Sequence, residues 1–207
     1  MKYMICFLLL ASIFIINTSE SLAAWLIYHK PEFRGKIIDA ETKEPIEGAV
    51  VVVAYSKYTV GFTGRDISVI KAKETLTDKN GEFYFPAYTT TIQPLSGDNN
   101  ASFLFYKPGY GSDPAVPRGL TAPSEEIFFS KAIGDTGELE GSPLIYRGNA
   151  MIKVTFGIVE LPELKTREER LKAIPSSPTD IRSKELPLLY KAINEERRSF
   201  GLKGEVK

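Results

Sequence analysis

Short apolar runs separated by turn-forming residues fill the middle of the chain, from residue 33 to residue 159. The runs are rich in Val, Ile, Phe and Tyr, and Gly, Pro, Asn and Asp separate them, which is typical of an all-β domain. They predict strands at residues 33–39, 49–57, 67–77, 82–88, 101–107, 125–130 and 144–159. Residues 58–66 are expected to form a loop. Seven short strands indicate a mainly β fold and favour a seven-stranded antiparallel β-sandwich over a β-barrel, which is the alternative.

Alternation within two of the strands indicates which side chains face the core. In residues 67–77, Ile70, Ala72 and Leu76 alternate with polar side chains, as expected when one face is wet, and Glu74 breaks this alternation. The inward-facing side chains predicted for the last strand are Ile152, Val154, Phe156 and Ile158.

A tight turn is predicted at residues 78–81, which end in Asn80 and Gly81. An Asn-Gly pair tolerates the positive φ that two-residue hairpin turns require. We therefore expect the third and fourth strands to form a hairpin.

Three of the predicted strands do not alternate. Residues 50–54, 102–106 and 127–129 are largely apolar throughout. A solvated sandwich face should alternate, so we expect the outer face of one sheet to be covered. The C-terminal tail is the nearest candidate, and a partner protein or a second copy of the chain is the alternative.

In the C-terminal tail the apolar residues are spaced as in an α-helix. Thr166 and Glu169 fit a capping box at the start of a helix that ends near residue 174. A second helix is expected over residues 184–200, with Pro187 in its first turn and Gly201 at its C-terminal cap. The side chains predicted to line its apolar side are Leu186, Leu189, Tyr190, Ile193 and Phe200.

The N-terminus has the pattern of a secretory signal peptide. Lys2 precedes an apolar run at residues 4–16, and small residues near Ala23 predict cleavage after Ala23. As a helix the run spans about 20 Å, short of the ~30 Å hydrocarbon core of a membrane. We therefore expect an exported protein, periplasmic or extracellular, without a membrane span once the signal is removed.

The chain is accordingly expected to have three parts: a signal peptide at residues 1–23, a β-sandwich domain at residues 24–160, and a helical tail at residues 161–207 that packs on the sandwich or on a partner. The one cysteine, Cys6, lies in the signal, so the core alone must stabilise the exported domain. The 26 basic and 26 acidic residues balance, so no nucleic-acid partner is expected.

Turn-and-strand motifs in four segments of the chain form one combined pattern. The segments are residues 35–39, 44–51, 75–83 and 107–110. They combine Pro-x-x-Gly-Ala before a Val run with Thr-Asp-x-x-Gly-x-Phe after a strand. This combination resembles the carboxypeptidase regulatory-like domain, a transthyretin-like β-sandwich module, in its stand-alone exported bacterial form. The resemblance covers residues 33–110 best and implies a module without catalytic residues of its own.

Residue types for catalysis or metal binding are scarce. A zinc or nucleophile-type site needs His or Cys partners, and the chain after Ala23 has His29 alone, expected to be a surface or packing residue. Residues 78–82 are interpreted as a turn and not as a calcium loop, because strands flank them. The acidic residues weighed as a glycosidase pair and interpreted as solvated are Glu125, Glu126, Asp135, Glu138 and Glu140. No catalytic residue, metal site or cofactor is predicted.

The loop at residues 110–119 is the candidate binding site, with Tyr110 and Arg118 as its contact residues. The alternative is a Pro-stiffened crossover whose Tyr110 packs back on the sandwich. The expected function is non-enzymatic, in protein binding or cell-envelope assembly, with another envelope protein as partner. A carbohydrate-binding accessory module that takes a glycan is the alternative, and residue counts argue against a hydrolase. The aromatic side chains available to stack on sugar rings are Trp25, Tyr58, Tyr88 and Tyr110.

Overall fold

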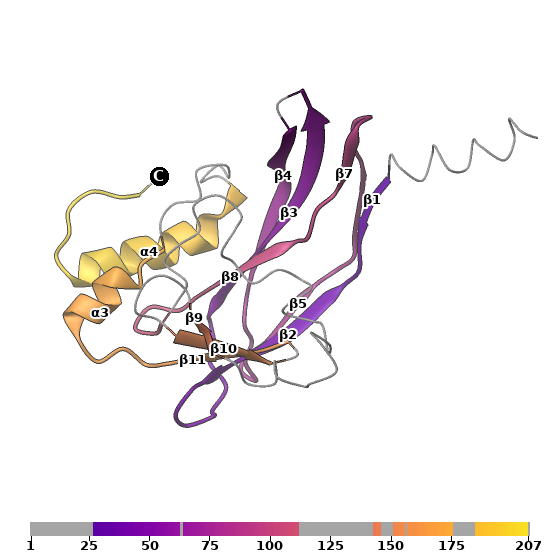
Figure 1. The fold of residues 1–207 in the computed structure, drawn as a ribbon. Helices are drawn as coiled ribbons and strands as arrows, with labels where there is room; N and C mark the ends of the chain where they lie inside the picture. Colours follow the sequence, from indigo (N-terminus) through magenta and orange to yellow (C-terminus); the bar gives the residue numbers. More distant parts are fainter. Residues whose placement is uncertain are drawn as a thin grey trace, which may run out of the picture.

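The computed structural model describes residues 27–62, 64–111, 143–145, 151–155, 157–175 and 185–206. This part of the chain is mainly β, with several antiparallel sheets and short helices near the C-terminus (Figure 1). The predicted signal peptide, its cleavage point after Ala23 and the strand expected at residues 125–130 lie outside the described residues.

The described strands are β1 (Ile27–Lys30), β2 (Phe33–Asp39), β3 (Val50–Gly61), β4 (Gly64–Leu76), β5 (Glu82–Phe85), β6 (Tyr88–Thr91), β7 (Ser96–Asp98), β8 (Ser102–Tyr106), β9 (Pro143–Ile145), β10 (Met151–Thr155) and β11 (Ile158–Leu161). The described helices are α3 (Arg167–Lys172) and α4 (Pro187–Ser199).

These strands form three sheets. A five-stranded sheet has the order β5-β2-β11-β10-β9, and a second sheet has β3 at its centre, paired with β4 along one edge and with β7 and β8 along the other. β1 and β6 form a separate two-stranded sheet. The described strands all pair antiparallel except β11 with β2, which are parallel. The expected purely antiparallel arrangement is therefore not what the structure has.

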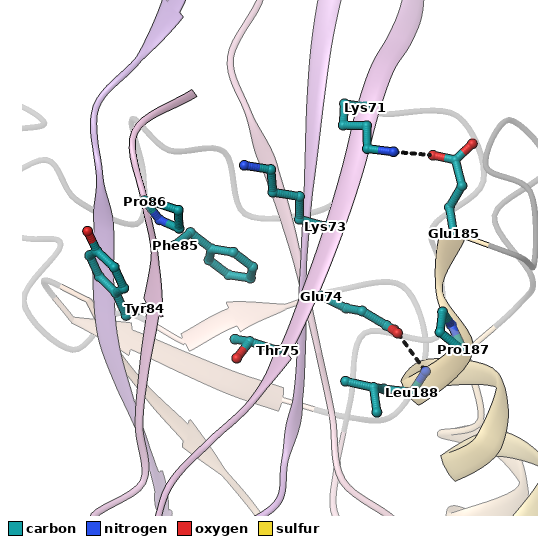
Figure 2. A pocket seen from close by; sticks show the side chains of 10 residues that line it. All are labelled: Lys71, Lys73, Glu74, Thr75, Tyr84, Phe85, Pro86, Glu185, Pro187 and Leu188. Carbon is teal, nitrogen blue, oxygen red and sulfur yellow. Dashed lines mark hydrogen bonds and ion pairs between the residues drawn. The ribbon is translucent and has the colours of Figure 1, made fainter. Parts of the chain in front are cut away.

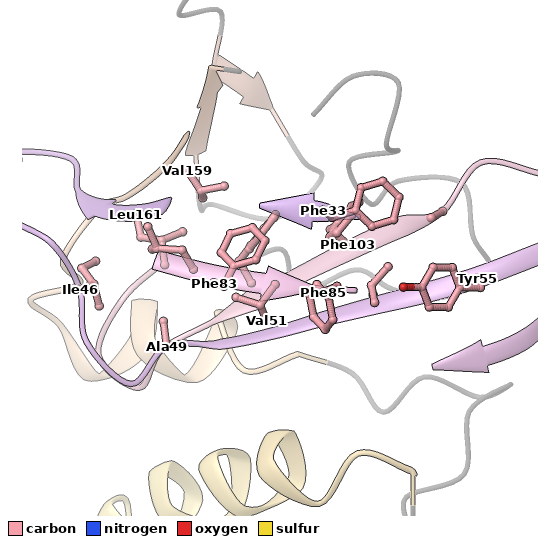
Figure 3. Close-up of a cluster of buried hydrophobic side chains, with 14 of the residues drawn as sticks. Phe33, Ile46, Ala49, Val51, Tyr55, Phe83, Phe85, Phe103, Val159 and Leu161 are labelled. Carbon is pink, nitrogen blue, oxygen red and sulfur yellow. The ribbon is translucent and has the colours of Figure 1, made fainter. Parts of the chain in front are cut away.

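The two larger sheets pack face to face around the main core (Figure 3). Side chains of β2, β5 and β11 meet those of β3 and β8, and Phe33 contacts Phe103 edge to face with ring centroids 5.2 Å apart. Aromatic rings prefer such edge-to-face geometry. The largest fully buried side chains of this core are Tyr28, Ile37, Tyr55, Phe103, Phe105 and Leu161.

A second core lies on the outer face of the β3 sheet, where α4 covers it. Val50, Val52 and Leu104 point to this face and pack against Leu189 and Ile193 of the helix. Residues 50–56 of β3 and most of β8 are therefore buried on both sides, by the five-stranded sheet and by α4. This double burial explains why their sequences do not alternate.

Residues 58–66 do not form the predicted loop. β3 and β4 continue to pair from Tyr58 and Ile67 to Gly61 and Gly64, so both strands are longer than expected. β7 supports this extension, because a Cβ at Gly97 would overlap the ring of Tyr58. Close approach of an aromatic ring to a glycine is not visible in a strand pattern, and the prediction was wrong for that reason.

The turn at residues 78–81 forms, but it does not make the expected hairpin. Gly81 has a φ of 73°, its N–H donates to the Asp78 carbonyl at 2.8 Å, and the Asp78 carboxylate accepts from the N–H groups of Asn80 and Glu82. The Gly81 carbonyl accepts from Ile37 N–H at 2.8 Å, which directs β5 to β2. β4 and β5 therefore belong to different sheets.

Two of the predicted strands are divided. β5 ends at Phe85 because Pro86 has no N–H for the ladder, and the chain resumes as β6 beside β1. Gly157, at a φ of 79°, turns the chain between β10 and β11. Val159 is therefore buried and Ile158 is 38% exposed, so the predicted inward position of Ile158 was wrong.

Both predicted tail helices form, but α3 ends at Lys172 and not near residue 174, and α4 begins at Pro187 and not at residue 184. In α3 the Thr166 hydroxyl accepts from Glu169 N–H at 3.2 Å, and the Glu169 carboxylate accepts from Thr166 N–H at 3.1 Å, which confirms the capping box. α4 has Pro187 in its first turn, and Gly201 follows its end at a φ of 73°.

Candidate interaction groove

A groove of about 630 Å³ opens where the edges of the two packed sheets and the start of α4 meet (Figure 2). Its lining comes from residues 71 and 73–75 of β4, residues 84–86 in and after β5, and residues 185, 187 and 188. In Figure 2 the side chain of Lys73 lies toward Phe85, whereas that of Glu74 points toward α4. β4 thus contributes to the groove from both of its faces.

The main chain of β4 is available at this groove. β4 pairs with β3 on one side, and within the described residues no strand pairs with its other side. The N–H of Thr77 donates to the Ala49 carbonyl at 2.9 Å, so the main-chain groups of Thr77 point toward β3. Successive residues of a strand point their N–H and C=O groups to opposite sides, so every second residue counted back from Thr77 also points toward β3. The residues whose main-chain groups then point away from β3 are Ala72, Glu74 and Leu76.

Glu74 joins the groove to the helix. Its two carboxylate oxygens accept hydrogen bonds from the N–H groups of Leu188 at 2.6 Å and Leu189 at 2.9 Å. These N–H groups lie in the first turn of α4, where intrahelical acceptors are missing, and Leu186 at the N-cap has no side chain that can accept. A strand residue therefore caps the helix, and the negative charge of Glu74 lies at the positive end of the helix dipole.

Lys73 provides the positive charge of the groove. Its ammonium lies 5.0 Å from the ring centroid of Tyr88 and 5.8 Å from that of Tyr55. Among the described residues no carboxylate lies within ion-pair distance of it, whereas neighbouring Lys71 lies 3.7 Å from Glu185. The ammonium of Lys73 is thus held against aromatic rings and remains able to pair with an incoming anion.

Tyr84 forms the opposite wall. Tyr84 is 46% exposed, the Arg34 guanidinium lies 4.7 Å from its ring centroid, and its hydroxyl donates to Glu32 at 3.1 Å. The hydrogen bond from Arg34 lowers the pKa of the Glu32 carboxyl. These contacts fix the orientation of Tyr84 at the rim.

A β-bulge limits the length of the free edge. The register between β3 and β4 shifts at Tyr55 and Ser56, which leaves Ile70 without an opposing residue. Bulges bend the edge of a sheet and interrupt its pairing with a further strand. The regular part of the edge therefore runs from Lys71 to Leu76.

Tyr110 lies away from this groove. It packs against the main core, and its main chain forms a bridge to Glu163. Burial raises the pKa of the Tyr110 hydroxyl, and Asp39 nearby adds to this shift. Tyr110 thus packs back on the sandwich, which is the alternative that the sequence left open. Arg118, the other contact residue proposed for the loop, lies outside the described residues.

Two of the tyrosine rings considered for sugar stacking, Tyr58 and Tyr88, contact other side chains. The Arg65 guanidinium lies 4.1 Å from the ring centroid of Tyr58, and Tyr88 stacks on Tyr55 at 4.5 Å. Trp25 lies outside the described residues. His29 is exposed and shares a hydrogen bond with the Thr89 hydroxyl at 2.7 Å, as expected of a surface residue.

Within the described ranges, no three His, Cys, Asp or Glu side chains gather in a way that suits a metal ion. None of the helices described there has the length and apolar character needed to cross a membrane. The five acidic residues weighed as a glycosidase pair, from Glu125 to Glu140, lie outside these ranges.

Comparisons of this chain with protein-family models, with curated proteins and with solved structures found no match.

Proposed function

We propose that this protein is an exported, non-enzymatic β-sandwich module that binds another protein of the cell envelope, and that the groove beside β4 receives an extended segment of that partner. The observation that carries this proposal is the main chain of β4 along the groove, whose outer side is paired with no strand of the described residues. A strand added to a sheet edge forms main-chain hydrogen bonds, and neighbouring pockets select its side chains.

The groove defines the chemistry of the partner segment. About six residues, Lys71 to Leu76, offer a regular edge, which suits a short extended peptide. Lys73, on the side of Phe85, forms no ion pair with any described residue, so an acidic side chain of the partner would lie opposite it. Tyr84 in the groove lining and Leu76 at the end of the regular edge are both exposed and add apolar contact area.

We also propose that the fold is transthyretin-like and that the chain is of the carboxypeptidase regulatory-like kind. The motif resemblance at residues 33–110 and the two sheets packed face to face support this. The N-terminal pattern that ends near Ala23 supports export to a periplasm or to the cell exterior. Carbohydrate binding has less support, because the described tyrosine faces contact Arg65 or Tyr55.

Substitution of Leu76 tests the proposed edge. Leu76→Pro removes an outward-pointing N–H, and proline is tolerated on edge strands. Leu76→Ala is the matched control, because it shortens the same side chain and keeps the N–H. A partner recovered from an envelope extract should bind Leu76→Pro at least about tenfold more weakly than Leu76→Ala, as expected when a main-chain hydrogen bond and its neighbours are lost. Equal binding of both variants would refute strand addition at β4.

A further inference from the structure

The hairpin of β3 and β4 ends in exposed apolar side chains. Val60 is 53% exposed and Phe62 is fully exposed. Leu95, in the connection between β6 and β7, is 79% exposed and lies beside Val60, to which it is hydrogen-bonded. We use the name arm tip for Val60, Phe62 and Leu95.

Hydrogen bonds hold the two segments of the arm tip together. Val60 N–H donates to the Leu95 carbonyl at 3.1 Å, and the hydroxyls of Thr59 and Ser96 lie 3.1 Å apart. β7 pairs with β3 directly behind, from Lys57 to Thr59. The three apolar side chains are therefore presented together on a paired backbone.

Leu95 is an unexpected residue at its position. Its φ is 65°, in the left-handed region that favours Gly or Asn, and its side chain is largely in water. Glycine or asparagine there would relieve backbone strain and remove exposed apolar surface. Since the fold gains little from this leucine, its side chain points to a role outside the fold.

The charges around the arm tip point to the kind of surface that it meets. Residues 58–65 and 92–97 contain no acidic residue. Arg65 lies over the ring of Tyr58 at 4.1 Å, one step behind the apex. Asp66 follows in the strand, and Asp98 is paired with Lys30 at 2.8 Å. An apolar apex backed by Tyr and Arg is the arrangement of side chains found at a lipid–water interface.

The shape of the arm tip also favours a lipid surface over a second copy of the chain. A stable protein interface buries about 800 Å² on each partner. The three side chains of the arm tip present much less area. A bilayer accepts such a small apex without a matching pocket.

We propose that the arm tip inserts into the boundary between the headgroups and the acyl chains of a lipid bilayer. The ring of Tyr58 and the guanidinium of Arg65 then lie at headgroup level, together with the carboxylate of Asp66, which is opposite Thr59 and stays hydrated there. This contact is separate from the groove beside β4, so it does not rest on the proposed partner segment, and either proposal can fail alone.

Flotation with lipid vesicles tests this proposal, with the exported, processed protein and its variants. Vesicles of phosphatidylcholine, and of phosphatidylcholine with an equal amount of phosphatidylglycerol, should both carry the protein, the second more strongly. Phe62→Ser and Leu95→Ser should each weaken partitioning by about tenfold, as expected for one buried apolar side chain. Ile158→Ser, an exposed apolar residue on β11, is the matched control and should not weaken it.

Two further variants separate lipid contact from a role in folding. Leu95→Gly should raise the midpoint of unfolding, because the strain is relieved, and should still weaken vesicle binding about tenfold. Phe62→Trp should show a blue shift of its emission on addition of vesicles. The proposal is overturned if the protein does not float, if Phe62→Ser floats as the parent does, or if Phe62→Ser instead abolishes self-association or capture of a protein.

Discussion

The carboxylate of Glu74, on an edge strand, accepts the N–H of Leu188 at 2.6 Å in the first turn of α4. A second bond, from Leu189 N–H at 2.9 Å, makes the contact bidentate. Glu74 is the residue that interrupts the alternation of its strand, and this contact gives the physical reason. The helix that covers the outer face of the sheet is thus fixed at its start by the sheet itself.

Loss of this cap should destabilise the protein. Glu74→Ala removes both acceptors and should lower the free energy of unfolding by about 1–2 kcal/mol, the usual cost of a lost N-cap. Urea unfolding followed by circular dichroism measures this. Glu82→Ala, an exposed carboxylate on β5, is the control and should change stability by less than about 0.5 kcal/mol. Similar effects of the two substitutions would contradict the capping role.

Because α4 packs on the outer face of the sheet, truncation of two adjacent leucines should cost different amounts of stability. Leu189 is fully buried against β3 and β8, whereas Leu188 is only partly buried at the groove. Leu189→Ala should cost about 2–5 kcal/mol, as large-to-small changes in a core do, and Leu188→Ala clearly less. Equal losses in a denaturant titration would show that α4 does not bury Leu189 on the sheet.

Removing one partner of the ion pair between the two helices should cost much more stability than removing both partners. Arg170 of α3 donates two hydrogen bonds, at 2.9 and 2.8 Å, to Glu196 of α4, whose side chain is 4% exposed. Arg170→Met leaves a buried carboxylate without its partner and should cost about 3 kcal/mol. The double variant with Glu196→Leu should recover most of this loss, because no buried charge then remains. A double variant no more stable than Arg170→Met would refute the account.

The stability of the turn after β2 should depend on pH through Asp39. This buried carboxylate accepts hydrogen bonds from the N–H groups of Thr42 and Glu41, and the bond from Thr42 is the main cause of its lowered pKa. A lowered folded pKa contributes stability above the unfolded value, 3.8, and this stability is lost as the pH falls through the folded pKa.

Asp39→Asn should therefore be less stable than the parent at pH 7, by about 1–2 kcal/mol. Denaturant midpoints at pH 7 and pH 3 measure the difference, which should shrink at the lower pH. Asp66→Asn, whose carboxylate makes no hydrogen bond within the described residues, serves as the control. If the denaturant midpoints of Asp39→Asn and the parent differ by the same amount at both pH values, the stabilising role of the Asp39 carboxylate is contradicted.

Local patterns in the sequence were enough to predict the elements that depend on local chemistry. The strands at residues 33–39 and 101–107, the capping box at Thr166 and the helix that begins at Pro187 all follow from residue types within a few positions. The absence of alternation in residues 50–54 also indicated that an outer face is covered. Burial on both faces of a strand leaves a direct signature in its sequence.

Features that depend on long-range contacts could not be predicted. The Asn80-Gly81 turn has local hairpin chemistry, yet the close contact of Gly81 with Ile37 sends the next strand to the other sheet. The groove was missed for the same reason, since Lys73, Tyr84 and Leu188 come together only through packing. The one signal of the groove in the sequence was Glu74, a charged residue at a position where an alternating strand should be apolar.

Amide hydrogen exchange along β4, measured residue by residue by NMR in the free protein, tests the central claim that this edge is open. The N–H groups of Lys73 and Thr75 point toward β3 and should exchange slowly, as paired amides do. Those of Ala72, Glu74 and Leu76 point away from β3 and should exchange much faster, which gives an alternating profile. Slow exchange at all five residues would show that the edge is already paired and would contradict the account.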